Sequence, residues 1–468
     1  MTQTEPQNPQ LHAGAAMVDI TPQAGTHLAG SVGEHRPAKL VAEPTFARVL
    51  ILESAGKKLC LVALDVTIVT APYTARIREA ARRFGLEPDA VMVHAIQTHS
   101  APPIGKFMVD EDFPELPPEF EWLTGGEDAY ADWALGRIET ALREANENLQ
   151  PVEMGAASGI EGRMAFNRRA VKHDGTIGMP GPRNWIEPLG PTWIRYIEGP
   201  IDPELGVVCL RGADLGMATM LLHYTCHPVH VFPRPIVSPD WPGTWAEEMR
   251  RSHGQQCVPL VLNGCCGNIN PWPPYDPDYV EDHRRMGRVL AETSAPVIES
   301  LQFSPDAELD WRVRHLQIPL REVPADDLKW AQQYLQDHPV PPWEDEAAGK
   351  VTRDWTRAAG LVSVELCRQR DGGMDYEVQA LRLGEIAIVG LPGEPFVEGQ
   401  LRIKLASPAR LTYVAHCTTQ YVGYVPTSEA LARGGHEADT SFWAKLAPDA
   451  LDTIVSASAD LLADLFAR

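Results

Sequence analysis

The chain has 468 residues, 44% of them hydrophobic, and a formal net charge of −22 at pH 7. This length and apolar content are sufficient for a large buried core. The excess of negative charge disfavours binding to the phosphates of nucleic acids and to anionic membrane surfaces. We therefore expect a globular protein that acts on a small molecule, with no nucleic-acid partner and no membrane anchor; a homo-oligomer is compatible with this composition.

The N-terminus and the cysteines favour a cytoplasmic protein. Residues 1–10 are polar and predict a disordered tail rather than a secretory signal, and no run approaches the roughly 18 apolar residues of a membrane span. The eight cysteines are scattered, without a C-x-x-C pair. We expect reduced thiols, with Cys265 and Cys266 as buried small residues rather than nucleophiles.

The pattern of apolar residues predicts an α/β fold with a mixed, strand-rich core covered by helices. In chain order, we expect strands at 13–20, 47–53 and 58–65, a helix at 71–84, a strand at 90–96, a surface loop at 104–128 and a helix at 130–148. Strands at 152–160, 206–211 and 218–223 follow, then a helix at 244–252, a strand at 258–262, a helix at 279–301 and a strand at 309–320. The remaining elements are a charged helical insertion near 325–357, strands at 377–382 and 386–389, a helix ending near 405, a strand at 411–415 and a last helix at 452–467.

Five apolar strands each end in a polar turn that contains glycine or proline. The residues of these turns that bear functional groups are His99, His227, Asn270, Glu394 and Tyr424. Strand ends of a buried sheet are where α/β enzymes place their chemistry. Two imidazoles, a carboxylate and a phenol meet the needs of an open catalytic zinc site.

One stretch concentrates histidine: His223, His227 and His230 lie within eight residues after an apolar run. Such density is typical of a metal or proton-transfer site, although one core histidine with two loop histidines would give the same pattern. Tryptophans crowd the neighbouring loops, where they either pack the loops or form a stacking platform for a sugar ring. They are Trp185, Trp193, Trp241, Trp245 and Trp272.

Seven motifs in order resemble the N-terminal catalytic domain of the neutral/alkaline ceramidase family. They read AGAAMVDIT, QTHSAPP, FNRR, CHPV, GCCGNINP, LPGEP and YVGYVPT. The resemblance covers nearly the whole chain and implies one large catalytic domain over 11–468. It implies a zinc-dependent amidohydrolase, and we expect the family's C-terminal immunoglobulin-like domain to be absent.

Carried over by position, the resemblance implies that His227, Glu394 and Tyr424 bind one zinc ion. The family's first histidine motif, His-Thr-His-Ser, here begins with Gln97 and keeps His99. Either His99 takes over as the remaining ligand, or Gln97 binds weakly through its amide oxygen, or the site is poor in metal.

A second departure concerns the nucleophile. The family's Gly-Asp-Val-Ser-Pro stands here as a motif ending in Asn270-Pro271, and asparagine cannot be acylated as serine is. Asn270 can instead donate a hydrogen bond to an oxyanion. The resemblance implies that Arg168 holds an anionic or carbonyl oxygen. We expect His230 to move protons and Asp240 to orient an imidazole.

These inferences predict a metal-dependent hydrolase that cleaves an amide bond with a metal-activated water. One alternative is a glycosidase or esterase acting on a carbohydrate, which the tryptophans and the missing serine favour. Another is a catalytically inactive binding homologue, which Gln97 and Asn270 favour.

Overall fold

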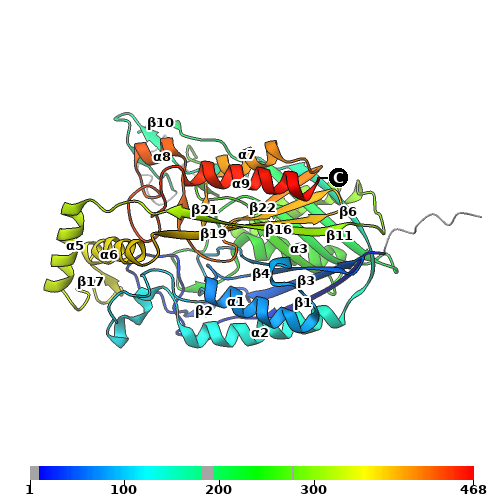
Figure 1. Ribbon diagram of the computed structural model, residues 1–468, viewed down its shortest axis with the longest axis horizontal. Coiled ribbons are helices and arrows are strands. Elements are labelled where there is room, and N and C mark those ends of the chain that lie inside the picture. Colours follow the sequence, from blue (N-terminus) through cyan, green and yellow to red (C-terminus); the bar gives the residue numbers. More distant parts are fainter. Residues whose placement is uncertain (1–9, 182–192, 277–278, 468) are drawn as a thin grey trace, which may run out of the picture.

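An eight-stranded mixed sheet is the largest element of the computed structural model, which describes residues 10–181, 193–276 and 279–467 (Figure 1). The β4–β5 and β12–β14 pairs are parallel and the other neighbours are antiparallel. The sheet order is β14 (Val258–Asn263), β12 (Met217–Tyr224), β11 (Glu204–Gly212), β6 (Gln150–Ile160), β1 (His12–Asp19), β3 (Phe46–Ser54), β4 (Lys57–Leu64) and β5 (Val91–Ala95).

A four-stranded sheet packs against one face of the larger sheet. Its order is β16 (Leu309–Pro319), β19 (Gly373–Leu383), β20 (Ile386–Gly390) and β22 (Leu411–Ala415). Side chains alternate along these strands: Ile386 and Ile388 face the larger sheet, whereas Ala387 and Val389 face the helices on the other side. This alternation is the period of two that a strand covered on both faces requires.

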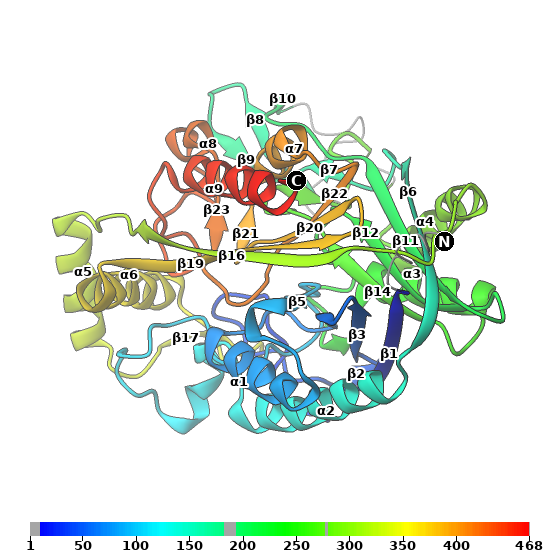
Figure 2. The same ribbon diagram turned by 45° about the vertical axis from the view of Figure 1, so that its right-hand side comes forward.

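Helices cover the two outer faces, so the fold has four layers (Figures 1 and 2). The outer face of the larger sheet packs on α1 (Ala71–Ala81), α2 (Asp128–Glu147), α3 (Asp240–His253) and α4 (His283–Glu299). The outer face of the smaller sheet packs on α7 (Val397–Ala406) and α9 (Ala450–Leu465). The predicted α/β class, with a strand-rich core under helices, is confirmed.

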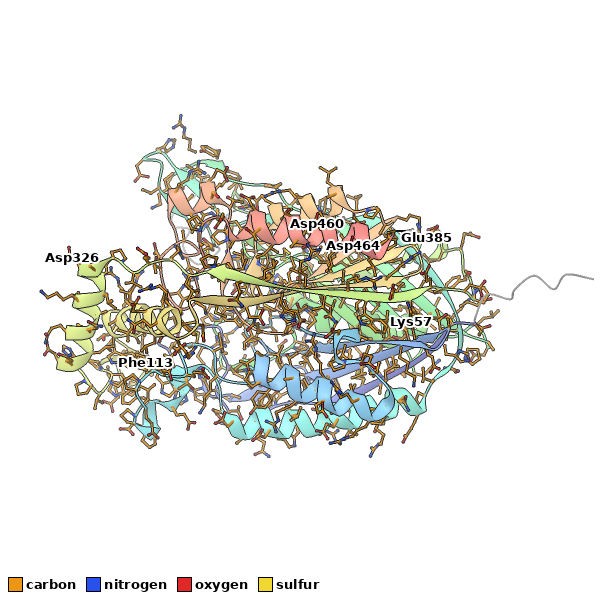
Figure 3. All side chains as sticks on the ribbon, in the orientation of Figure 1. Lys57, Phe113, Asp326, Glu385, Asp460 and Asp464 are labelled. Atoms are coloured by element: carbon orange, nitrogen blue, oxygen red, sulfur yellow. The ribbon has the colours of Figure 1, made fainter. Side chains whose placement is uncertain are left out.

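Tyr413 of β22 sets the separation of the two sheets at one point. Its ring is almost fully buried in the core between the sheets, and its hydroxyl contacts the carbonyl oxygen of Ala157 at 3.2 Å. A Cβ atom at Gly206 would lie 2.1 Å from the Tyr413 ring, so only glycine allows this approach. At the rim of the larger sheet, where Figure 3 labels Lys57, an ion pair of 2.9 Å joins this lysine to Asp310 of the smaller sheet.

The charged helical insertion expected near 325–357 contains two helices. α5 (Ala325–Asp337) and α6 (Arg353–Asp371) flank a hairpin of β17 (Trp343–Asp345) and β18 (Lys350–Val351), and they project beyond the sheets (Figure 2). The prolines at 341 and 342 lie between the two helices, where a continuous helix would lose backbone hydrogen bonds. The predicted helix at 279–301 begins at His283, where the Asp282 side chain accepts bonds from two backbone amides.

Short strands and a single-turn helix connect the loops at one end of the sheets. The described set comprises β2 (Leu40–Val41) with β13 (Ile236–Val237), β7 (Phe166–Asn167) with β15 (Ile269–Asn270), β21 (Glu394–Pro395) with β23 (Tyr424–Val425), the sheet β10–β8–β9 (Ile194–Ile197, Ala170–Lys172, Ile177–Gly178) and α8 (Ser428–Arg433). The predicted loop at 104–128 carries only a 3₁₀ turn, Pro118–Thr124.

Three further expectations concern the cysteines, the absence of a membrane-spanning helix and the N-terminal tail. All eight cysteines are buried and free. Within the described ranges, none of the helices has the length and apolarity needed to cross a bilayer. The expected N-terminal tail, except for residue 10, falls outside the described residues.

Candidate functional site

A cavity of about 410 Å³ opens where the loops of the two sheets meet, and we call it the inner cavity. Six of the residues singled out from the sequence line it: Gln97, His99, Arg168, Asn270, Glu394 and Tyr424. Apolar side chains from other loops complete the wall, among them Phe107, Met108, Met179, Phe232 and Trp272. An apolar cavity with a few converging polar groups is the usual form of a small-molecule site.

Short strand pairs bring these residues together from distant parts of the chain. Glu394 lies opposite Tyr424 in the parallel β21–β23 pair. The β7–β15 pair sets Asn270 opposite Phe166, two residues before Arg168. The backbone amide of His99 donates to the carbonyl oxygen of Pro228 at 3.2 Å, which joins the loop after β5 to the loop after β12.

His227 lies beneath the cavity floor, fully buried, with both ring nitrogens facing oxygen atoms. Nδ1 lies 2.6 Å from the carbonyl oxygen of Cys266 and 3.1 Å from that of Ile269, and Nε2 lies 3.0 Å from Oε2 of Glu394. A neutral imidazole carries only one N–H. The arrangement therefore needs one more positive charge next to Nε2, which either a second ring proton or a metal cation would supply.

Glu394 is buried and ionised. Burial alone would raise the pKa of this carboxyl, but the hydrogen bond from His227, the positive charge of Arg168 and a hydrogen bond from Gln97 outweigh it and hold the pKa well below its ordinary value. Its other oxygen accepts a hydrogen bond from the Tyr421 hydroxyl at 2.8 Å. Four neighbours thus stabilise one negative charge at the cavity wall.

Arg168 organises the opposite side of the site. Its guanidinium donates to Oδ1 of Asn270 at 3.2 Å, to the Tyr424 hydroxyl at 3.1 Å and to Glu437 at 2.8 Å. Because Oδ1 of Asn270 accepts from Arg168, the amide NH₂ group of Asn270 is the end left to donate. Burial and the charge of Glu394 raise the pKa of the Tyr424 phenol, so it remains protonated at neutral pH.

His99 approaches the cavity over a glycine. A Cβ atom at Gly30 would lie 2.5 Å from Nδ1 of His99, and Gly30 has a left-handed φ of 100°. Nδ1 is buried, with no hydrogen-bond partner among the described residues. Burial, with the nearby His227, lowers the pKa of His99 to about 3, so its imidazole is neutral at neutral pH.

His230 and Asp240 lie together, as expected of an oriented imidazole, but not at the inner cavity. Nδ1 of His230 lies 3.1 Å from Asp240 and Nε2 lies 2.9 Å from the Tyr279 hydroxyl. His230 lines a separate cavity of about 170 Å³. The two ring nitrogens are thus engaged away from Glu394, and the geometry does not bring His230 to the proposed chemistry. His223 is a core residue bonded to the Val414 carbonyl at 3.1 Å.

Four of the five tryptophans singled out from the sequence lie in the described residues, and of these four Trp272 lines the inner cavity. Trp241 and Trp245 of α3 are fully buried in the core, so of the two alternatives left open by the sequence, packing applies to them and stacking on a ligand does not. Trp185 lies outside the described residues.

Two residues of the site were not anticipated. Tyr421 lies three positions before Tyr424 in the motif YVGYVPT, so that motif could have identified it as a further site residue. Glu437 joins Arg168 to Arg169, whose ion pairs measure 2.8 and 2.7 Å, and no strand-end pattern precedes it. Burial would raise the pKa of Glu437, but Arg168 and Arg169 lower it to about 2.

The residues fit a metal ion in part. An Nδ1–H donated to a carbonyl and an Nε2 directed at a carboxylate is the usual arrangement of a metal-binding histidine. Gln97, however, hydrogen-bonds Glu394 where the resemblance expects an imidazole. Among the described residues, no three His, Cys, Asp or Glu side chains converge on one point. The donor set fits a cation held by His227 and Glu394, with fewer protein ligands than the expected four.

Two of the solved structures that match this fold are ceramidases. One is described as neutral ceramidase from Pseudomonas aeruginosa, with a TM-score of 0.72 at 18% identity, covering 98% of this chain and 75% of that chain. The other is described as ceramidase complexed with C2, with a TM-score of 0.71 at 17% identity, covering 97% and 75%. No family model and no curated protein sequence matches the chain. The chain therefore has the fold of a ceramidase catalytic domain, in agreement with the motifs.

Proposed function

We propose that the inner cavity hydrolyses an amide bond of a small molecule. The observation that carries this proposal is the convergence of an ionised, buried carboxylate with a set of hydrogen-bond donors on one apolar cavity. The fold shared with neutral ceramidases supports an amide as the bond. The chain has asparagine at the position where the resemblance places a nucleophilic serine, so we propose water as the nucleophile.

The donors of the site suit the charge that develops during amide hydrolysis. When water attacks the amide carbon, the carbonyl oxygen becomes an oxyanion, which fixed donors in a dry site stabilise. The free NH₂ of Asn270 and the guanidinium of Arg168 would supply this stabilisation. Because Arg168 also bonds Glu437 and Tyr424, its position is fixed before substrate arrives.

A zinc ion remains part of the proposal, with His227 and Glu394 as the residues that would hold it. When bound, such an ion lowers the pKa of water and supplies a nucleophile at neutral pH. Neutral His99 lies in the same cavity and would accept a hydrogen bond from the attacking water. Phe107 and Phe232 would cover the apolar part of the substrate and exclude bulk water.

The test is a screen of purified protein against N-acyl amides of varied chain length, with release of free amine as the readout. Asn270→Ala should lower kcat by about 100- to 1000-fold, the loss typical of one oxyanion donor, with little change in substrate binding. Chromogenic glycosides and carbohydrate esters form the comparison panel. Cleavage of those compounds alone would replace the amide proposal, whereas binding without turnover of any compound would indicate a binding homologue.

A further inference from the structure

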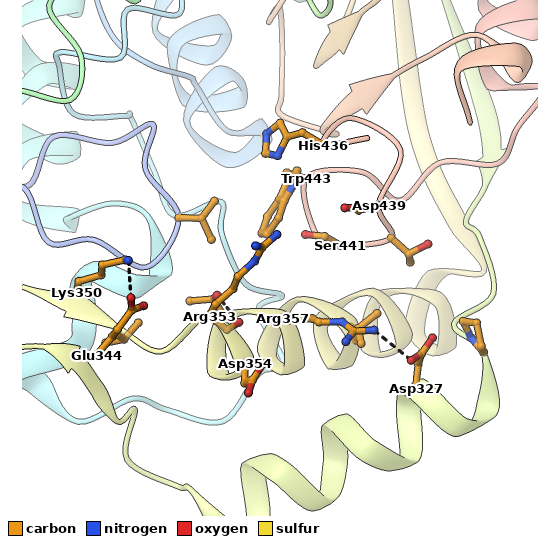
Figure 4. A pocket seen from close by; sticks show the side chains of 16 residues that line it. Asp327, Glu344, Lys350, Arg353, Asp354, Arg357, His436, Asp439, Ser441 and Trp443 are labelled. Atoms are coloured by element: carbon orange, nitrogen blue, oxygen red, sulfur yellow. Dashed lines mark hydrogen bonds and ion pairs between the residues drawn. The ribbon is translucent and has the colours of Figure 1, made fainter. Parts of the chain in front are cut away.

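A second cavity of about 880 Å³ adjoins the inner cavity, and we call it the outer cavity (Figure 4). The two cavities share Val32, His436 and Trp443 in their linings. The outer cavity lies between the inserted helices and the loop that carries His436 and Trp443. A molecule bound in the inner cavity can therefore extend past this shared wall.

The outer cavity holds one cation without an acidic partner. Arg357 pairs with Asp327 at 3.2 Å, and Lys350 pairs with Glu344 at 2.8 Å. The Arg353 guanidinium forms no ion pair or hydrogen bond with any residue that the structure describes. Two acids of the lining, Asp354 and Asp439, also form no ion pair among the described residues, so the direction of each side chain decides where the positive charge is felt.

The direction of Arg353 places this charge next to the shared wall. Figure 4 shows its side chain rising from the first turn of α6 towards Trp443, whereas Asp354 points to the opposite side of the helix. The remaining acid of the cavity, Asp439, interacts electrostatically with Arg321. The Arg353 guanidinium therefore places an unpaired positive charge next to the shared wall, within a protein whose net charge is −22.

We infer that the natural substrate carries an anionic group, which Arg353 binds in the outer cavity while the amide lies in the inner cavity. This inference rests on the proposed function and narrows its substrate class to N-acyl amines that bear a carboxylate, as N-acyl amino acids do. A planar guanidinium suits a carboxylate because it offers two parallel N–H donors. The apolar wall of the inner cavity suits the acyl chain.

The kinetic test uses two substrates with the same acyl chain, an N-acylglycine and the neutral N-acylethanolamine. Arg353→Gln should raise KM for the acylglycine by about fivefold, the upper range for an exposed ion pair, and leave kcat and the neutral substrate unchanged. Raised salt should shrink the difference. Arg357→Gln is the matched control, since that arginine is already paired, and it should alter neither KM. Equal changes for both substrates, or none, would overturn the inference.

A binding measurement keeps the inference separate from the proposed reaction. Calorimetric titration of the wild-type protein and Arg353→Gln with the same N-acylglycine needs no turnover. Weaker binding by Arg353→Gln without any cleavage would support the anion site and overturn amide hydrolysis. Unchanged binding in a protein that cleaves neutral amides would overturn the anion site and leave the proposed function standing.

Discussion

Gln97→His should convert a weak cation site into a tight zinc site. The Gln97 side chain is buried and already reaches Glu394, so an imidazole at this position would add a nitrogen ligand beside His227 and Glu394. The backbone at Gln97 has a φ of 66°. Histidine is among the residues that tolerate such values best, so the substitution adds little strain.

The expected gain in zinc affinity is about 100-fold. Loss of a group that merely orients a metal-binding residue costs about 10- to 100-fold in affinity, so a direct ligand should contribute at least the upper value. A 100-fold gain equals about 2.7 kcal/mol of binding free energy. At saturating zinc the same energy stabilises the folded state. For a chain of this length, zinc should raise the Tm of the variant by about 3 °C more than that of the wild type.

Competition titration with a chromogenic zinc chelator measures the affinity, and elemental analysis of dialysed protein measures the stoichiometry. Gln97→Ala is the control, because it removes the amide without supplying an imidazole, and it should bind zinc no more tightly than the wild type. A folded Gln97→His protein with wild-type zinc affinity would refute the assignment of residue 97 to the cation site. A wild type that retains one zinc through dialysis would refute the claim that Gln97 weakens the site.

Three further predictions test the site. His227→Ala should abolish the weak zinc binding of the wild type, measured by chelator competition, while circular dichroism stays that of the folded protein. Zinc affinity equal to that of the wild type would place the metal elsewhere. Glu437→Gln should weaken the pH dependence of the free energy of unfolding, measured by urea denaturation at acid pH. Ionised Glu437 contributes about 3 kcal/mol to this free energy above pH 4.5, and the contribution is lost as the pH falls towards its folded pKa of about 2. An unchanged pH profile in the variant would exclude that contribution. Gly30→Ala should destabilise the folded state by about 1–3 kcal/mol and displace the His99 ring. The expected results are a lower Tm and weaker substrate binding. Wild-type values for both would contradict the close contact between Gly30 and His99.

The sequence was sufficient to predict which strand ends meet at the inner cavity, because strand ends appear in it as apolar runs that stop at glycine or proline. His99, Asn270, Glu394 and Tyr424 were identified in this way, and they line one cavity. Glu437 could not be identified from such a pattern, because it follows no predicted strand and lies 269 residues from its partner Arg168 in the sequence.

Side-chain direction limited the remaining inferences. Spacing placed His230 three residues after His227, but spacing in an irregular loop does not determine which wall a side chain faces, and it faces another cavity. Trp241 and Trp245 are four residues apart in α3, so both lie on the helix face that packs on the sheet. The helix predicted from the sequence began only at residue 244, so it did not include Trp241. The position of the two tryptophans on one helix face was therefore not predicted.

The contact of Tyr413 with Gly206 extends the functional constraint on this protein deep into its core. His99 and Asn270 follow strands of the larger sheet, whereas Glu394 and Tyr424 follow strands of the smaller one. The two halves of the proposed reaction centre are therefore carried by separate sheets, and the distance between them depends on the packing of those sheets. Selection for chemistry should act on Tyr413 and Gly206 as strictly as on residues that touch substrate, and enlarging Gly206 should impair turnover under conditions in which the chain still folds.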